Sequence, residues 1–560
     1  MTPLLRRGVR AVALTLSGYL ALAAGPGAAV AAAPTYELIK GSGSSWAGNA
    51  VAEWVAEVDA KDIKVVYTAN GAAQGRKDYA NKSSDFGVTD SPYRGKDPST
   101  GAVDSSLGRS FAYLPIVAGG TAFPYNVTVG GKRIKNIRLS GETLARIFTN
   151  KITNWNDAAI TKDNNGRALP SIPIIPVVRA DGAGVTNQFT TWMVSQYPGL
   201  WKDCNGGKVA ATDYFPLNCG AARGQQRAQT GSDGVMNFLK SKGSVGAIAM
   251  EEYSYPLAAG YPVAKLLNKA GYFTLPTQYN VAVALTAAEI NDNPKDPNYL
   301  TQKLDKVYVN PDKRTYPLSS YVYAIIPTAA DDSKMTTPKR QALTDFLKHS
   351  VCVGQSAIGP IGYSPLPINL VQASLTQVNK LKKADPKVVF DASIIKNVKN
   401  CHNPTFVPGK PSENYLAKIA PYPAECDRPG QGPCGDEVGT FNDNPEGTGG
   451  KPGAGTGGTG ATPGASAGGG SGPAPATVDT DGDGVPDAPA AGGDVPVGGG
   501  GSTTGTTDDT VNVVATTLDP DARSGPPKIL GALVLGLFLG VLIVPPVVAQ
   551  VVGSSRRRTP

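Results

Sequence analysis

The feature that most limits the possible fold is an alternation of strand-like and helix-like segments between residues 35 and about 420. The first stretch predicts a strand over 36–40, a helix over 47–58, a strand over 63–67, a second helix, and a strand over 84–90. This order predicts an α/β fold in which a parallel sheet is flanked by helices.

Turns made of small residues follow these strands, at 41–46, 70–75 and 89–92, and a fourth such turn covers 179–186. In α/β sheets, ligands bind beyond the carboxyl ends of the strands, where the free N–H groups of helix N-termini attract anions. Arg179 adds a fixed positive charge to the fourth turn. Together the turns predict an oxyanion-binding site, although packing alone is the ordinary explanation for any one of them.

Composition and missing motifs argue against several classes of function. The net charge of +8 comes from scattered basic residues, so nucleic acid is not an expected partner. Two His and six Cys do not suggest a His-rich metal site or a zinc cluster. The chain has neither a phosphate-binding loop of the Gly-x-x-x-x-Gly-Lys-Ser/Thr kind nor a Gly-x-Ser-x-Gly nucleophile turn. We therefore expect a binding protein without a cofactor, not an enzyme.

Both ends of the chain carry apolar segments. A basic start, an apolar run and small residues over 1–33 predict a secretory signal peptide, with an uncleaved anchor as the alternative. Residues 528–552 are long enough to form a transmembrane helix. Three arginines in the tail, 553–560, predict that this tail is cytoplasmic and that the binding domain is extracellular on the cell membrane. A cleaved sorting tail is the alternative.

A linker rich in Gly, Pro and Asp is expected over 426–527, between the domain at 34–425 and the membrane helix. Such a segment buries too little apolar area to fold, so we predict a disordered tether. Within it, Asp479, Asp481, Asp483 and Asp487 have the spacing of a calcium loop. Position twelve of that loop is Ala490 instead of the usual glutamate, so a solvated acidic linker is the favoured interpretation.

All six cysteines lie on the predicted extracellular side, where disulfides persist. Fifteen pairings are possible for six cysteines. We favour pairing between neighbours, namely Cys204–Cys219, Cys352–Cys401 and Cys426–Cys434.

The chain resembles the phosphate-binding proteins of high-affinity phosphate ABC transporters from about residue 38 to 367. The motifs that carry this resemblance are 41–46 (GSGSSW), 84–90 (SDFGVTD), 139–148 (LSGETLARIF), 152–156 (ITNWN), 178–182 (VRADG), 243–248 (GSVGAI) and 362–367 (GYSPLP). The resemblance implies a two-lobed periplasmic-binding-protein fold that closes on its ligand, with hinges near 115–125 and 268–323.

The resemblance also implies a set of ligand-binding residues. Ser45 corresponds to a hydroxyl ligand, Trp46 and Gly184 to backbone donors, and Arg179 to the ligand arginine with which Asp181 pairs. Asp90 corresponds to the carboxylate that accepts the proton of a monohydrogen oxyanion, which favours phosphate over fully ionised sulfate.

Three positions depart from the family pattern. Ala72, Ala183 and Val185 stand where the family has hydroxyl residues, so only their backbone N–H groups remain as donors. A hydrogen bond to a charged group is worth about 1.5–3 kcal/mol, so these changes predict weaker phosphate binding or another ligand.

Two functions remain open at this point. The first is a membrane-tethered solute-binding protein that binds inorganic phosphate or a related oxyanion and delivers it to an ABC permease. The second is a non-transport surface protein, acting in adhesion or sensing, with a degenerate ligand site on the same fold.

Overall fold

The computed structural model describes residues 35–96, 101–217, 219 and 225–434. These residues belong to the first of two compact units, Met1–Thr456. The predicted signal peptide, the acidic calcium-loop candidate, the membrane helix and the cytoplasmic tail lie outside the described residues. Within the described ranges, no helix is long and apolar enough to cross a membrane.

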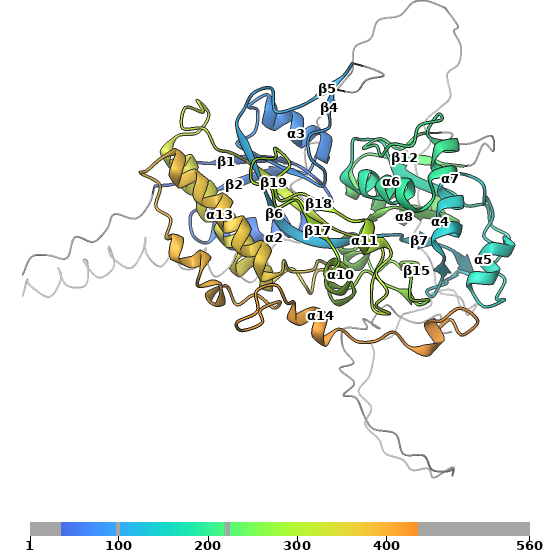
Figure 1. Cartoon of the computed structure of the whole chain (residues 1–560). Coiled ribbons are helices and arrows are strands. Elements are labelled where there is room, and N and C mark those ends of the chain that lie inside the picture. Colours follow the sequence, from blue (N-terminus) through green and yellow to red (C-terminus); the bar gives the residue numbers. More distant parts are fainter. Residues whose placement is uncertain (1–34, 97–100, 218, 220–224, 435–560) are drawn as a thin grey trace, which may run out of the picture. The chain divides into compact units, whose positions relative to one another are not determined.

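A six-stranded sheet in the order β14-β6-β19-β3-β1-β2 forms the centre of lobe I (Figure 1). β1, β2 and β3 are parallel, whereas β19 runs antiparallel to both β3 and β6. The strands are β1 Ile39–Gly43, β2 Val65–Thr68, β3 Phe86–Thr89, β6 Phe111–Ala122, β14 Glu251–Glu252 and β19 Ser319–Pro327. The helices of this lobe are α2 Gly48–Asp59, α3 Ala72–Ala80, α10 Gln278–Leu285, α12 Thr337–Val351 and α13 Ile368–Ala384.

Lobe II contains a four-stranded sheet in the order β12-β11-β13-β7 and a three-stranded sheet in the order β10-β15-β16. The strands are β7 Tyr125–Asn126, β10 Arg138–Leu139, β11 Ile175–Arg179, β12 Arg227–Gln229, β13 Ala247–Ala249, β15 Lys265–Leu267 and β16 Phe273–Thr274. The helices are α4 Gly141–Phe148, α5 Ala158–Asp163, α6 Gly184–Gln196, α7 Pro198–Cys204 and α8 Gly231–Lys240.

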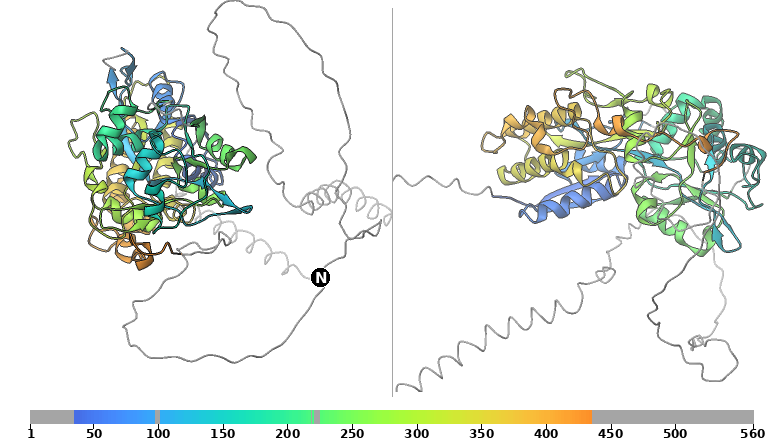
Figure 2. Two further views of the ribbon diagram at one scale, coloured as in Figure 1. Left: turned by 90° about the vertical axis from the view of Figure 1, so that its right-hand side faces the viewer. Right: turned by 90° about the horizontal axis from the view of Figure 1, so that it is seen from below.

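Short elements complete the described chain. Three two-stranded ribbons consist of β4 Gly95–Lys96 with β5 Val103–Asp104, β8 Thr128–Val129 with β9 Lys132–Arg133, and β17 Glu289–Ile290 with β18 Gln302–Lys303. The short helices are α9 Ser254–Ala258, α11 Asp305–Tyr308 and α14 Tyr415–Ile419. The right-hand view of Figure 2 shows the N-terminal segments in blue beside the C-terminal helices in yellow, in the same lobe.

The predicted α/β order is confirmed, with one shift in the first strand. The sequence predicts a strand over 36–40, but β1 runs from Ile39 to Gly43 and includes the glycines assigned to a turn. A side chain at Gly41 would place its Cβ 2.1 Å from the ring of Phe86. Position 41 of the strand is therefore a glycine because the aromatic ring of the neighbouring strand occupies the space that a side chain would need.

The two lobes are linked at several crossings. β6 of lobe I leads into β7 of lobe II, within the predicted hinge at 115–125. β13 leads back into β14 around Met250, which lies outside the second predicted hinge. A further crossing, from β16 to α10, does fall within the range 268–323. The sequence missed the crossing at Met250 because three apolar residues and two glutamates there give no turn signal.

The three predicted disulfides are confirmed as Cys204–Cys219, Cys352–Cys401 and Cys426–Cys434. The last one lies beyond the predicted domain boundary at 425. Residues 426–434 are attached to lobe II, because Lys265 forms an ion pair of 2.8 Å with Asp427 and Arg138 donates to the carbonyl of Cys426. Residues 426–434 therefore pack against the described part of the domain, beyond the predicted boundary at 425.

Removing the Cys352–Cys401 link should destabilise the chain more than removing the Cys426–Cys434 link. The first closes a loop with a sequence separation of 49, the second a loop of 8, and longer loops lose more entropy in the unfolded state. Cys352→Ala with Cys401→Ala should cost roughly 2–5 kcal/mol in urea unfolding. An equal or larger loss in the paired Cys426→Ala and Cys434→Ala variant would contradict this ranking.

Candidate functional site

Five loops meet where the parallel strands of both lobes end. In lobe I they follow β1, β2 and β3, and in lobe II they follow β11 and β12. The sequence predicted four of them. The fifth, Thr230-Gly231-Ser232, also leads from a strand through a glycine into a helix, and that pattern was the signal available for finding it.

A chain of polar contacts connects Arg179 of lobe II to Ser45 of lobe I. The Arg179 Nη1 atom donates to the hydroxyl of Ser232 over 3.4 Å, and this hydroxyl lies 2.9 Å from the hydroxyl of Ser45. All three side chains are buried. The predicted arginine and the predicted serine are therefore in one cluster, joined by a serine that the sequence analysis missed.

Asp181 fixes the direction of the Arg179 guanidinium. One carboxylate oxygen accepts from Nε over 2.8 Å, and the other accepts from Nη2. The backbone N–H of Gly231 also donates to Asp181, over 3.0 Å. Burial alone opposes the charge on Arg179, but the attraction of Asp181 outweighs it and the pKa of the guanidinium is raised. The arginine therefore remains a fixed cation whose Nη1 side faces the cluster.

Asp90 lies against the first turn of α6, across the boundary between the lobes. A Cβ added at Gly184 would lie 1.8 Å from the Asp90 Oδ2 atom, so only glycine fits there. The backbone carbonyl of Asp90 accepts from Gln188 Nε2 over 2.8 Å, which holds the loop in place. Oδ2 itself is buried without a hydrogen-bond partner. It is thus an acceptor available for a donor at this position.

Burial raises the pKa of Asp90 to about 6, although the Ser44 hydroxyl and the charge of Arg179 oppose the rise. A second carboxyl, which the sequence analysis missed, stands in the same environment. Burial raises the pKa of Glu251 to about 7, against the opposing charge of Arg179. Glu251 also has a buried oxygen, Oε2, without a partner. The site thus contains two carboxyls that exchange protons near neutral pH.

The remaining predicted residues lie at the starts of helices. Ala72 is the first residue of α3, Ala183 is the N-cap of α6 and Val185 is the second residue of α6, and all are buried. N–H groups in a first helical turn have no partner within the helix. Trp46 is buried just before α2, and its carbonyl accepts from the Tyr363 hydroxyl over 2.7 Å. The N–H of Ala183 already donates to the carbonyl of Asp213 over 2.9 Å, so the other positions offer backbone donors, and none of the four offers a side-chain hydroxyl.

A buried ion pair joins the lobes beside this cluster. Arg76 of α3 contacts Asp213 of lobe II over 2.6 Å and also binds Asp104 over 2.9 Å. Nearby, the N–H of Ala73 donates to the carbonyl of Gly182 over 3.0 Å. The sequence gave no signal for the Arg76–Asp213 pair, because its members are 137 residues apart and belong to no common motif.

Metal ligands do not gather anywhere in the described part of the chain: no group of three or more His, Cys, Asp or Glu side chains could hold an ion there. Arg179 and the helix N-termini are donors, whereas Asp90 and Glu251 accept protons or hydrogen bonds. This combination suits a small oxyanion that carries at least one proton.

Comparison with known proteins identifies the family of the chain. A family model described as a PBP superfamily domain matches residues 28–352. The phosphate-binding protein PstS 3 of Mycobacterium tuberculosis is 29% identical over 346 residues, which make up 61% of this chain and 86% of that protein. The phosphate-binding protein PstS of Methanocaldococcus jannaschii is 29% identical over 359 residues, or 62% of this chain and 88% of its own.

A solved structure of a high-affinity periplasmic phosphate-binding protein with bound phosphate aligns at 18% identity and a TM-score of 0.45, over 65% of this chain and 98% of that one. The curated relatives confirm the predicted resemblance to phosphate-binding proteins. Because the family model covers more than half of the 560 residues, the chain belongs to the PBP superfamily of solute-binding proteins.

Proposed function

We propose that this chain is an extracellular solute-binding protein that binds inorganic phosphate, or a related protonated oxyanion, for uptake by an ABC transporter. The observation that carries the proposal is the cluster in which Arg179 and Ser45 are joined through Ser232, with Asp90 beside the first turn of α6. Curated relatives that match most of their own length are named phosphate-binding proteins, which supports the same ligand.

In this proposal Arg179 and the N–H groups at positions 46, 72, 184 and 185 donate to the anion. Asp90 accepts the proton that the anion carries, through its unpartnered oxygen. Ser45 and Ser232 add hydroxyls, and Ser232 compensates in part for the hydroxyls absent at 72, 183 and 185. Ala183 then acts only through its place at the N-cap of α6.

The charge balance favours a protonated anion. Arg179 is already paired with Asp181, so its charge is shared, and Asp90 and Glu251 add two acidic groups nearby. A fully ionised anion would meet these carboxylates without a proton between them, and the repulsion would weaken its binding. An adhesion or sensing protein with a degenerate site is the alternative, and it gains support if phosphate does not bind.

Replacing Arg179 with alanine should reduce phosphate affinity by at least about tenfold, because a charge-assisted hydrogen bond is lost. Calorimetry of the full chain in detergent with inorganic phosphate measures this change. Arg227→Ala is the matched control, since Arg227 is an exposed arginine at the start of the adjacent strand β12. The proposed site would be overturned if the parent chain gave no heat of phosphate binding. It would also be overturned if the Arg179→Ala variant bound phosphate with the same affinity as the parent.

Sulfate binding should strengthen as the pH falls from 7.5 to 5. Asp90 has a pKa of about 6, so it is largely ionised at the higher pH and repels sulfate, whereas the protonated carboxyl at the lower pH donates to it. The gain in affinity should be at least about tenfold.

Asp90→Asn should remove most of this pH dependence, because the amide donates at every pH. Glu251→Gln, measured in parallel, separates the contribution of the second carboxyl. A sulfate affinity that is independent of pH in the parent chain, or that falls at low pH, would contradict the assignment of Asp90 as the proton acceptor.

We also propose that residues 528–552 anchor the protein in the cell membrane, with the domain outside. The apolar length of this segment and the three arginines behind it support the anchor. Deleting residues 528–560 should release the protein into the medium, as measured by immunoblotting of cell and medium fractions. Retention of the truncated chain on the cells would refute the anchor.

A further inference from the structure

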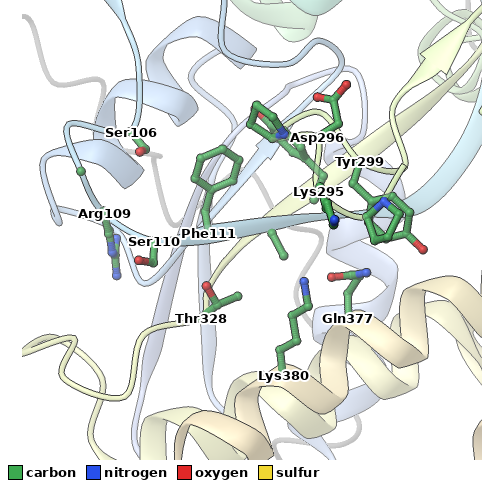
Figure 3. A pocket seen from close by; sticks show the side chains of 15 residues that line it. Ser106, Arg109, Ser110, Phe111, Lys295, Asp296, Tyr299, Thr328, Gln377 and Lys380 are labelled. Carbon is green, nitrogen blue, oxygen red and sulfur yellow. The ribbon is translucent and has the colours of Figure 1, made fainter. Parts of the chain in front are cut away.

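A pocket lies in lobe I, built from residues that are not part of the cluster around Arg179. It has a volume of about 410 Å³ and lies between the start of β6, the end of β19, the helix α13 and the loop 294–299 (Figure 3). Pockets of about 300–1,000 Å³ are typical of sites for small organic ligands, so the space exceeds what a single inorganic anion fills.

Two lysines from separate elements face this pocket. Lys380 comes from α13 and Lys295 from the loop, and Figure 3 shows both ammonium groups directed into the same space. Among the described residues, neither ammonium forms an ion pair. Asp296 also lines the rim, but its carboxylate accepts from the N–H of Asn298 over 2.8 Å and points away from Lys380 in Figure 3. The charge inside the pocket is therefore positive.

The position of Lys380 is unfavourable without an anion. Burial and the nearby charge of Lys383 lower the pKa of the Lys380 ammonium. A negative group in the pocket would relieve both effects, because it would compensate the charge and replace lost hydration. The lysine pair thus matches a ligand with one doubly charged group or two singly charged groups.

A buried polar atom without a partner provides an independent indication of a ligand. Gln377 is 2% exposed and lines the pocket, yet its Oε1 atom has no hydrogen-bond partner. Arg109 also lines the pocket, but its guanidinium is held in the core, where Nε pairs with Asp332 and Nη1 donates to the carbonyl of Tyr79. Leaving a buried acceptor unpaired is costly, so an occupant that donates to Gln377 would recover this cost.

One wall of the pocket is apolar. Phe111 and Tyr299 present aromatic rings to the space. Pro294 and Pro297 also line it. Aromatic and proline surfaces of this kind pack against the C–H face of a small ring. Ser110 and Thr328 offer hydroxyl groups on the opposite side, where they can bind the polar substituents of the same ring.

We propose that this pocket binds a small hydroxylated organic phosphate of the size of a sugar phosphate. The phosphate lies between Lys295 and Lys380, the ring packs on Phe111 and Tyr299, and a hydroxyl donates to Gln377 Oε1. The site is separate from the oxyanion site proposed above, so the two can be occupied together.

Calorimetry of the full chain in detergent tests the proposal, with excess inorganic phosphate present to fill the first site. Glucose 6-phosphate should bind, whereas glucose should bind at least about tenfold more weakly because the lysines lack a charged partner. Lys380→Gln and Lys295→Gln should each weaken glucose 6-phosphate binding about 10- to 100-fold. Lys387→Gln is the matched control, since Lys387 is an exposed lysine just beyond α13 and does not line the pocket.

Gln377→Leu keeps the approximate shape of the side chain and removes the acceptor, so it should weaken the binding of glucose 6-phosphate. The binding of inorganic phosphate at the first site should not change. Thermal unfolding of each variant shows whether the domain remains folded. The proposal is overturned if glucose 6-phosphate gives no heat above excess phosphate, or if its affinity is the same in the parent chain and in the variant carrying both lysine changes.

Discussion

Two reciprocal contacts determine how the lobes meet, and each joins a glycine of one lobe to a carboxylate of the other. Gly184 of lobe II lies against Asp90 of lobe I, and a Cβ at Gly71 of lobe I would lie 2.7 Å from Asp181 of lobe II. Any larger residue at either position would push a carboxylate and the opposite lobe away. The N-termini of α3 and α6 can therefore face a common space only because both positions lack a side chain.

The boundary between the lobes also contains a charged contact, the ion pair between Arg76 and Asp213. Both side chains are almost fully buried when the lobes are together. Water that enters between the lobes would hydrate both charges, and this hydration offsets the Coulomb attraction that is lost. The buried ion pair therefore makes the contact between the lobes specific in register.

The sequence predicts most of the fold because glycine-rich turns mark where strands end and helices begin. The loops after the strands and Arg179 follow from this pattern, whereas Ser45 and Asp90 were predicted as ligand residues from the resemblance to phosphate-binding proteins. The sequence did not predict Glu251, because two glutamates after an apolar strand look like a solvated strand end, whereas the structure buries them between the lobes. The sequence pattern could not predict the Arg76–Asp213 pair either, because only tertiary folding brings the two residues together.

The C-terminal segment of the domain touches both lobes before the chain continues toward the proposed tether. Cys401 ties it to α12 of lobe I, α14 packs on α10, and Asp427 attaches it to β15 of lobe II. In Figure 1 this segment, in orange, runs along the lower edge, whereas α3 and α6 face each other at the upper edge. A pull on the tether is thus distributed over both lobes at the side opposite the ligand loops. Force on this segment would therefore reach the domain away from the loops that follow β1, β3 and β11, so mechanical tension and ligand binding use separate sides of one domain.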